Sequence, residues 1–206
     1  MLDSMRSRNI SERPINQFIT QAIRGIKRRL RPVDKPCWEM HRDVLNALLP
    51  PHGTNRVERD YWEKRGSSEK SNQEVLWLDP DFQAVEGKHI TYLWGLCRGK
   101  AVLDVGAGWG RFGVKLRGSY QAYTGLEQSN SMIARGPKNI KLVHGSAINM
   151  PFRIESFDVA FMVICLSSVH RNVFAIYNEA MRCLKPGGVF VILESDISVV
   201  FEKPTP

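Results

Sequence analysis

The segment Val102–Gly113, which reads VLDVGAGWGRFG, constrains the fold more than any other part of the chain. Its apolar run carries Asp104 near the end and leads into three alternating glycines, Gly106, Gly108 and Gly110. Glycine has no Cβ atom and adopts positive φ readily, so the pattern predicts a tight turn from a buried strand into a helix N-terminus. A flat, polar ligand can lie against the bare backbone of such a turn. The segment therefore predicts a nucleotide-type site at the carboxyl edge of a parallel sheet.

The glycine spacing by itself does not identify the nucleotide. From Gly108 onward the sequence GWGRFG also fits the GxGxxG pattern of dinucleotide-binding proteins. Counted from Gly106, however, the third glycine position is Arg111, which opposes close helix packing in a dinucleotide fold. The next apolar run ends at Glu127, where an acidic side chain can accept hydrogen bonds from both hydroxyls of a ribose.

Five motifs follow one another along the chain: VLDVGAGWG, GLEQSNSMI, GSAINMPF, FDVAF and LKPGG. In this order and at these spacings the chain resembles class I S-adenosylmethionine-dependent methyltransferases. Within that family it is most similar to the small-molecule enzymes of the ubiquinone/menaquinone-biosynthesis type. The resemblance covers about Tyr92 to Ser195. It implies an α/β, Rossmann-like fold with a mostly parallel sheet, helices on both faces, and S-adenosyl-L-methionine as the cofactor.

The resemblance also implies which residues hold the cofactor. Glu127 corresponds to the acidic residue that binds the ribose, and Asp104 to the one that orients the glycine turn or bonds toward the methionine end. Ser146 stands where the family often has an aspartate for the adenine amino group, and a serine hydroxyl or the Ala147 backbone can take its place. The implied cofactor-binding set is Asp104, Gly106, Ala107, Gly108, Gly110, Glu127, Gln128, Ser146, Ala147 and Ile164.

His170 is the candidate catalytic residue. In the family this region lies where substrate and cofactor meet, and a neutral imidazole there can accept a proton from an acidic hydroxyl. A substrate contact or a helix cap remains the alternative role for His170. We expect Cys165 to be a buried apolar residue rather than a nucleophile. No metal site is expected, because the four cysteines show no CxxC or paired spacing.

The charge distribution divides the chain into two parts. The formal net charge is +8, and residues 1–35 hold nine Lys or Arg against three Asp or Glu. We therefore predict a basic, helical N-terminal extension with a linker over residues 1–72 and the methyltransferase domain over residues 73–206. Because the basicity lies in the extension, it argues against nucleic acid as a partner of the domain itself. Apolar residues at helical spacing within 14–31 predict an amphipathic helix that docks on its own domain, on a protein partner or on an anionic membrane surface.

The alternation of apolar and polar segments predicts the elements of the domain. Strands are expected at about 101–105, 122–126, 140–143, 157–163 and 189–194, and helices at about 81–97, 111–118, 129–135 and 172–184. A loop is expected near 66–72, where glycine and serine cluster. Eleven residues follow Ser195, where a complete class I fold carries an antiparallel strand pair. The C-terminal strands are therefore expected to be short or missing, so that either another segment completes the sheet or the reading frame is truncated.

These observations predict an S-adenosylmethionine-dependent methyltransferase of the EC 2.1.1 type. The expected acceptor is a small molecule or a lipid-linked or saccharide-linked intermediate, and the expected reaction is an in-line displacement that needs positioning more than acid–base groups. Two alternatives stay open: a non-catalytic methyltransferase-like subunit, and an RNA methyltransferase steered by the basic N-terminus. The cysteine pattern and the shortness of the apolar runs favour a cytoplasmic location, with a membrane-peripheral one as the alternative.

Overall fold

The computed structural model describes residues 45–46, 60–68, 70–72, 80–169, 172–194 and 198–205. The predicted amphipathic helix within 14–31 and the candidate catalytic residue His170 lie outside these residues. The described elements are α4 (Tyr61–Gly66), α6 (Pro80–Leu96), β1 (Ala101–Val105), α7 (Arg111–Lys115), β2 (Ala122–Glu127), α8 (Asn130–Ala134), β3 (Leu142–His144), β4 (Phe157–Val163), α9 (Leu166–Val169), α10 (Val173–Cys183), β5 (Leu184–Leu193) and β6 (Ser198–Glu202).

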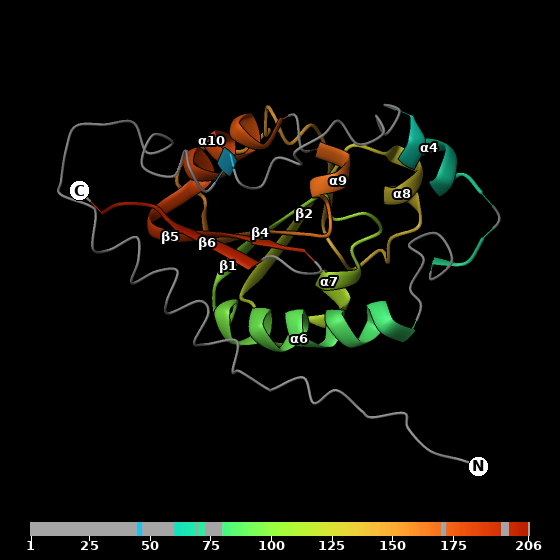
Figure 1. Cartoon of the computed structure of the whole chain (residues 1–206), viewed down its shortest axis with the longest axis horizontal. Coiled ribbons are helices and arrows are strands. Elements are labelled where there is room, and N and C mark those ends of the chain that lie inside the picture. The colour runs from blue at the N-terminus through green and yellow to red at the C-terminus, as the bar shows by residue number, and fades with distance from the viewer. Residues whose placement is uncertain are drawn as a thin grey trace, which may run out of the picture. The chain divides into compact units, whose positions relative to one another are not determined.

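The strands form one sheet in the order β3-β2-β1-β4-β5-β6 (Figure 1). All neighbouring pairs are parallel except β5 and β6, which are antiparallel. Parallel neighbours need crossover connections, and the helices between the strands supply them. The order reverses between β1 and β4, and ligands of such sheets bind at the carboxyl ends of the strands around this point. The predicted Rossmann-like, mostly parallel fold is confirmed.

Helices cover both faces of the sheet (Figure 1). Successive residues of a strand point to opposite faces, so each central strand contributes to two cores. On one face, Leu103 and Ala160 pack with buried residues of α10. On the other face, Val102 and Phe161 pack with buried residues of α6 and α7. Burial on both sides explains why β1 and β4 read as nearly continuous apolar runs.

The C-terminal part of the sheet consists of a hairpin. Strand β6 has five residues and pairs with β5 in antiparallel register, with Leu193 opposite Ser198. Phe201 on β6 is buried, and its ring stacks on Phe190 at 6.2 Å and meets Tyr177 edge to face at 5.1 Å. A short C-terminal strand was among the expected outcomes, and the aromatic cluster is the physical reason that it holds its place.

Helix α4 is a finding that the sequence did not predict, because the polar stretch around it has no apolar periodicity. It begins after Asp60 and ends at Gly66, so the loop predicted near 66–72 starts at Ser67, and Asn72 is helical again. A Cβ atom at Gly66 would lie 2.4 Å from Ser131 Oγ and 2.9 Å from the Met132 nitrogen, so α4 and α8 approach too closely for any other residue. Tertiary packing on α8 therefore supports this short helix. Among the described residues, no helix has the length and apolar character needed to cross a membrane.

Candidate cofactor and acceptor site

The turn that follows β1, residues 106–110, is referred to here as the glycine turn. Gly106, Gly108 and Gly110 all have positive φ, at 78°, 56° and 81°. The backbone nitrogens of Gly106 and Ala107 donate to the Leu126 carbonyl at 2.9 and 3.0 Å, which ties the turn to the end of β2. Residues other than glycine rarely adopt these backbone angles. The turn therefore uses glycine at these three positions, and its backbone is left bare there. This is the surface that the sequence predicted for a flat, polar ligand.

Glu127 lies at the end of β2 beside the glycine turn. Its Oε2 accepts the Gly108 N–H at 2.9 Å, and its Oε1 accepts the N–H groups of Gln128 and Ser129, each at 2.8 Å. The residue is 9% exposed. An ionised carboxylate offers about four acceptor positions, so Glu127 keeps the capacity to accept a ligand hydroxyl while the backbone holds it in place.

Asp104 occupies a different environment, beneath the turn. Its Oδ2 accepts a hydrogen bond of 2.5 Å from the Tyr123 hydroxyl, and both residues are buried. Burial raises the pKa of Asp104 to about 7; the nearby charge of Glu127 adds to this rise, and the bond from Tyr123 opposes it. The described contact therefore joins β1 to β2, and the predicted role of Asp104 toward the methionine end of the cofactor stays a prediction.

The end of β4 meets the glycine turn from the other side. Ile164 has φ of 53°, which is a strained conformation for a β-branched residue, and such strain often marks a functional position. Its N–H donates to the Leu193 carbonyl at 2.8 Å, and the Cys165 N–H donates to Glu194 Oε1 at 2.7 Å. A Cβ atom at Gly106 would lie 2.8 Å from Cys165 Sγ. Residues of β4 and β5 thus fix the backbone that lies against the turn.

The Cys165 thiol is not placed to act as a nucleophile. Its Sγ donates to the Val163 carbonyl at 3.3 Å. Burial, with the negative charges of Glu194, Asp104 and Glu127, raises the pKa of the Cys165 thiol far above the neutral range. A protonated thiol is a weak nucleophile, so Cys165 serves as a packing group against the glycine turn.

Ser146 and Ala147 follow β3, which pairs with β2 so that His144 lies opposite Glu127. The Gly145 N–H donates to the Glu127 carbonyl at 3.0 Å, which brings this segment to the predicted ribose position. Ser146 Oγ accepts the Ile148 N–H at 3.4 Å. The predicted cofactor-binding residues thus lie near or just after the carboxyl ends of β1, β2, β3 and β4, with Asp104 turned to the protein interior. Their contacts with a cofactor stay a prediction.

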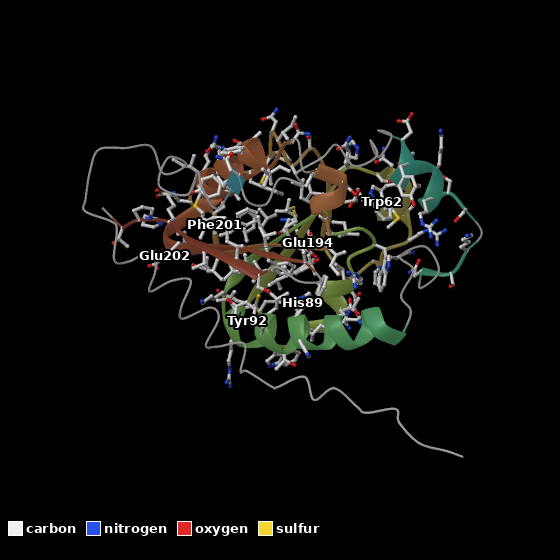
Figure 2. All side chains as sticks on the ribbon, in the orientation of Figure 1. Trp62, His89, Tyr92, Glu194, Phe201 and Glu202 are labelled. Carbon is white, nitrogen blue, oxygen red and sulfur yellow. The ribbon has the colours of Figure 1, made fainter. Side chains whose placement is uncertain are left out.

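Sequence reasoning missed Glu194, Tyr123 and the two α4 residues Trp62 and Glu63. Glu194 had a usable signal, because it is an acidic residue at the carboxyl end of a predicted strand, as Glu127 is. The side chains of Trp62 and Glu194 come from elements far apart in the sequence (Figure 2). The Trp62 indole N–H donates to Ser168 Oγ on α9 at 3.2 Å. No local pattern announces a contact between residues so distant along the chain.

With the glycine turn and Glu127 placed at one sheet edge, comparison with known proteins identifies the domain. Residues 103–192 match a family model described as a methyltransferase domain. Residues 103–192, somewhat less than half of the chain, therefore belong to a class I S-adenosylmethionine-dependent methyltransferase domain. The predicted family is confirmed, and so is S-adenosyl-L-methionine as its methyl donor.

Curated relatives are similar to about half of this chain. Demethylmenaquinone methyltransferase of Staphylococcus epidermidis is 36% identical over 117 residues, which cover 52% of this chain and 48% of the relative. The enzyme of the same name from Staphylococcus aureus is 36% identical over 110 residues, covering 49% of this chain and 45% of the relative. The chain thus spans about half the length of the curated relatives it matches.

Solved structures agree on the fold. Phosphoethanolamine N-methyltransferase 1 of Haemonchus contortus, with phosphoethanolamine and S-adenosylhomocysteine, aligns with a TM-score of 0.52 at 21% identity, covering 75% of this chain and 32% of that one. The methyltransferase in a complex with the Haloferax volcanii Trm112 activator gives a TM-score of 0.50 at 23% identity, covering 68% of this chain and 59% of that one. These likenesses support the class I architecture.

Proposed function

We propose that the protein transfers a methyl group from S-adenosyl-L-methionine to a small-molecule acceptor, including lipid-linked or saccharide-linked ones. One observation carries the proposal: the Gly108 N–H donates a hydrogen bond of 2.9 Å to Glu127 Oε2 and so joins Glu127 to the glycine turn. This contact puts a carboxylate for ribose hydroxyls next to bare backbone. Relatives 36% identical and named for demethylmenaquinone support an acceptor of the small-molecule class.

S-adenosyl-L-methionine supplies a methyl group already activated by its sulfonium. With the cofactor held by the glycine turn and Glu127, the acceptor nucleophile would form a bond to the methyl carbon as the carbon–sulfur bond breaks, and the electron pair of that bond would stay on sulfur. The acceptor proton leaves to a base or to water. Glycine-turn backbone, Glu127 and the Ile164–Cys165 turn hold the reactants, and positioning of this kind contributes up to about 7–11 kcal/mol in intramolecular reactions.

The acceptor side of the site is defined here as Trp62, Cys165, Ser168 and Glu194. His170 comes next in the sequence after α9, and it is the proposed proton acceptor for a hydroxyl substrate. His170→Ala should lower kcat and leave the affinity for S-adenosylhomocysteine unchanged. Equal activity of the variant at every pH would assign the proton to water instead.

Calorimetric titration with S-adenosylhomocysteine tests the cofactor part of the proposal. Glu127→Ala should weaken binding by about 1.5–3 kcal/mol, the range for hydrogen bonds that involve a charged group. Methyl transfer from labelled S-adenosylmethionine to demethylmenaquinone and to cell extracts tests the acceptor part. Binding without transfer to any acceptor would favour the non-catalytic subunit, and absence of binding would refute the proposal.

A further inference from the structure

Helix α4 lies outside the segment that matches the methyltransferase domain, yet it is bonded to α8 within that segment. Glu63 Oε2 accepts the Ser129 hydroxyl at 2.8 Å, and Glu63 Oε1 accepts the Ser131 N–H at 3.2 Å. The Ser131 hydroxyl donates in return to the Glu63 carbonyl at 2.7 Å. The backbone of α4 and the start of α8 are therefore fixed relative to each other.

Arg135, at the C-terminal end of α8, makes a second set of hydrogen bonds to α4 and the residues after it. It donates to the carbonyls of Gly66 and Lys70 at 2.6 and 2.8 Å, to the Ser68 carbonyl, and to Asn72 Oδ1 at 3.2 Å. These bonds satisfy carbonyls at the end of α4 and in the loop after it, a frequent use of arginine near helix ends. The α4 joint thus has two parts, one at Glu63 and one at Arg135, which can be perturbed separately.

Ser129 links the α4 joint to the cofactor site. Its backbone N–H donates to Glu127 Oε1 at 2.8 Å, while its hydroxyl donates to Glu63 and accepts the Met132 N–H at 3.1 Å as the N-cap of α8. Ser129 is 4% exposed, so it has little freedom to move without disturbing both carboxylates. The hydrogen bond from Ser129 lowers the pKa of Glu63, because it stabilises the ionised carboxylate.

We propose that Glu63 is a positioning residue of the cofactor site, which acts through Ser129 to hold Glu127 where it accepts the ribose hydroxyls. From the same helix, the contact of Trp62 with Ser168 extends this α4 scaffold to the acceptor side. The segment around α4 is then part of the working site rather than a linker. This inference rests on the proposed cofactor binding and adds a residue that the domain match does not include.

A double-mutant cycle tests the inference, with S-adenosylhomocysteine as the calorimetric probe. Glu63→Gln keeps the size of the side chain but removes its charge, and it should weaken binding about fivefold in the wild-type background. If Glu63 acts through Glu127, the same change should have no effect in the Glu127→Gln background, because the interaction that it perturbs is already lost. The coupling energy between the two positions would then equal the whole effect of Glu63→Gln. A purely structural role would weaken binding equally in both backgrounds.

Arg135→Met is the matched control. It breaks the second part of the α4 joint without touching Ser129, so it should lower the melting temperature while S-adenosylhomocysteine affinity stays within about twofold. Equal losses of affinity for Arg135→Met and Glu63→Gln, or no loss for Glu63→Gln, would overturn the inference. A wild-type protein that does not bind the probe would refute the proposed function and this inference with it.

A glycine pair gives an independent test. A Cβ atom at Gly66 would lie 2.4 Å from Ser131 Oγ, whereas one at Gly95 on α6 meets nothing within 4 Å. Gly66→Ala should therefore push α4 away from α8 and weaken S-adenosylhomocysteine binding about fivefold, while Gly95→Ala should leave binding unchanged. Unchanged binding by a folded Gly66→Ala protein would contradict the role of the α4 joint.

Discussion

The glycine turn and the acceptor side use contacts of very different sequence range. The bond between Gly108 and Glu127 joins residues 19 positions apart, within one strand–helix–strand unit. The bond from Cys165 to Glu194 spans 29 positions, and the bond from Trp62 to Ser168 spans 106. Long-range contacts carry a larger loop-closure entropy cost, so they depend more on other contacts that order the intervening chain. The proposed donor half is thus a compact unit, while the proposed acceptor half also draws on a contact from α4, far away in the sequence.

This difference has a functional consequence. A donor site contained in one supersecondary unit can be kept while other segments change, so the same cofactor can serve different acceptors. In this chain the proposed acceptor side uses residues from α4, α9 and the segments that follow β4 and β5. Changes in the glycine turn should therefore act on cofactor affinity, and changes on the acceptor side should act mainly on stability and acceptor use.

The largest expected effect comes from Gly108→Val. Gly108 has φ of 56°, and a Cβ atom there would lie 3.3 Å from Met132 Cε, so a β-branched side chain meets both backbone strain and crowding. We expect S-adenosylhomocysteine affinity to fall at least about 100-fold, as measured by calorimetry. Gly95→Ala is the control, and an affinity of Gly108→Val within threefold of the wild type would break the comparison.

A second effect concerns Asp104 and pH. Its pKa is about 7 in the folded protein against 3.8 for the ordinary group, so between these values the native state holds a proton that the unfolded chain has released. The contribution of Asp104 to stability is therefore greatest at low pH and is lost as pH rises through about 7. Between pH 5 and pH 7 it should lower the free energy of unfolding by about 2 kcal/mol.

Asp104→Asn isolates this contribution, because asparagine can still accept the Tyr123 hydroxyl but does not titrate. Urea unfolding at several pH values should show that the wild type loses stability relative to Asp104→Asn as pH rises. Parallel pH profiles for the two proteins would show that Asp104 stays ionised in the folded state.

Glu194→Ala probes the acceptor side. It leaves the partly buried Cys165 N–H without its acceptor, so the free energy of unfolding should fall by about 1 kcal/mol. S-adenosylhomocysteine affinity should stay within about twofold, because the glycine turn keeps its own bonds to β2. A loss of affinity greater than tenfold would show that the acceptor side belongs to the donor site and would remove the distinction between the two halves.

The smallest expected effect is a gain from Ser146→Asp. The family often has an aspartate at this position, and a carboxylate is a stronger acceptor than the serine hydroxyl for an adenine amino group. We expect affinity for S-adenosylhomocysteine to rise about threefold in calorimetry. Asn139→Asp adds the same charge at an exposed position and should change nothing. Equal effects of the two substitutions would mean that Ser146 lies away from the adenine.

The sequence by itself determined the mostly parallel, Rossmann-like class of the sheet, the glycine turn and the position of Glu127. Each follows from short-range patterns: apolar strands, glycines that adopt positive φ, and an acidic residue at a strand end. Strand and helix limits were close to those observed, except that β5 begins at Leu184 and α7 and α8 are shorter than expected. These limits depend on hydrogen bonding to neighbouring strands and on capping, which local patterns define less sharply.

Only the tertiary structure decided which side chains surround the glycine turn and Glu127. It turned Asp104 toward Tyr123, because burial between two strands favours the partner that satisfies its carboxyl group. It also formed α4 from a polar stretch by packing Gly66 against α8, and it placed Glu194 against Cys165. Such contacts depend on which distant segments the completed sheet brings together, and side-chain complementarity across 60 to 110 positions leaves no periodic signal in the sequence.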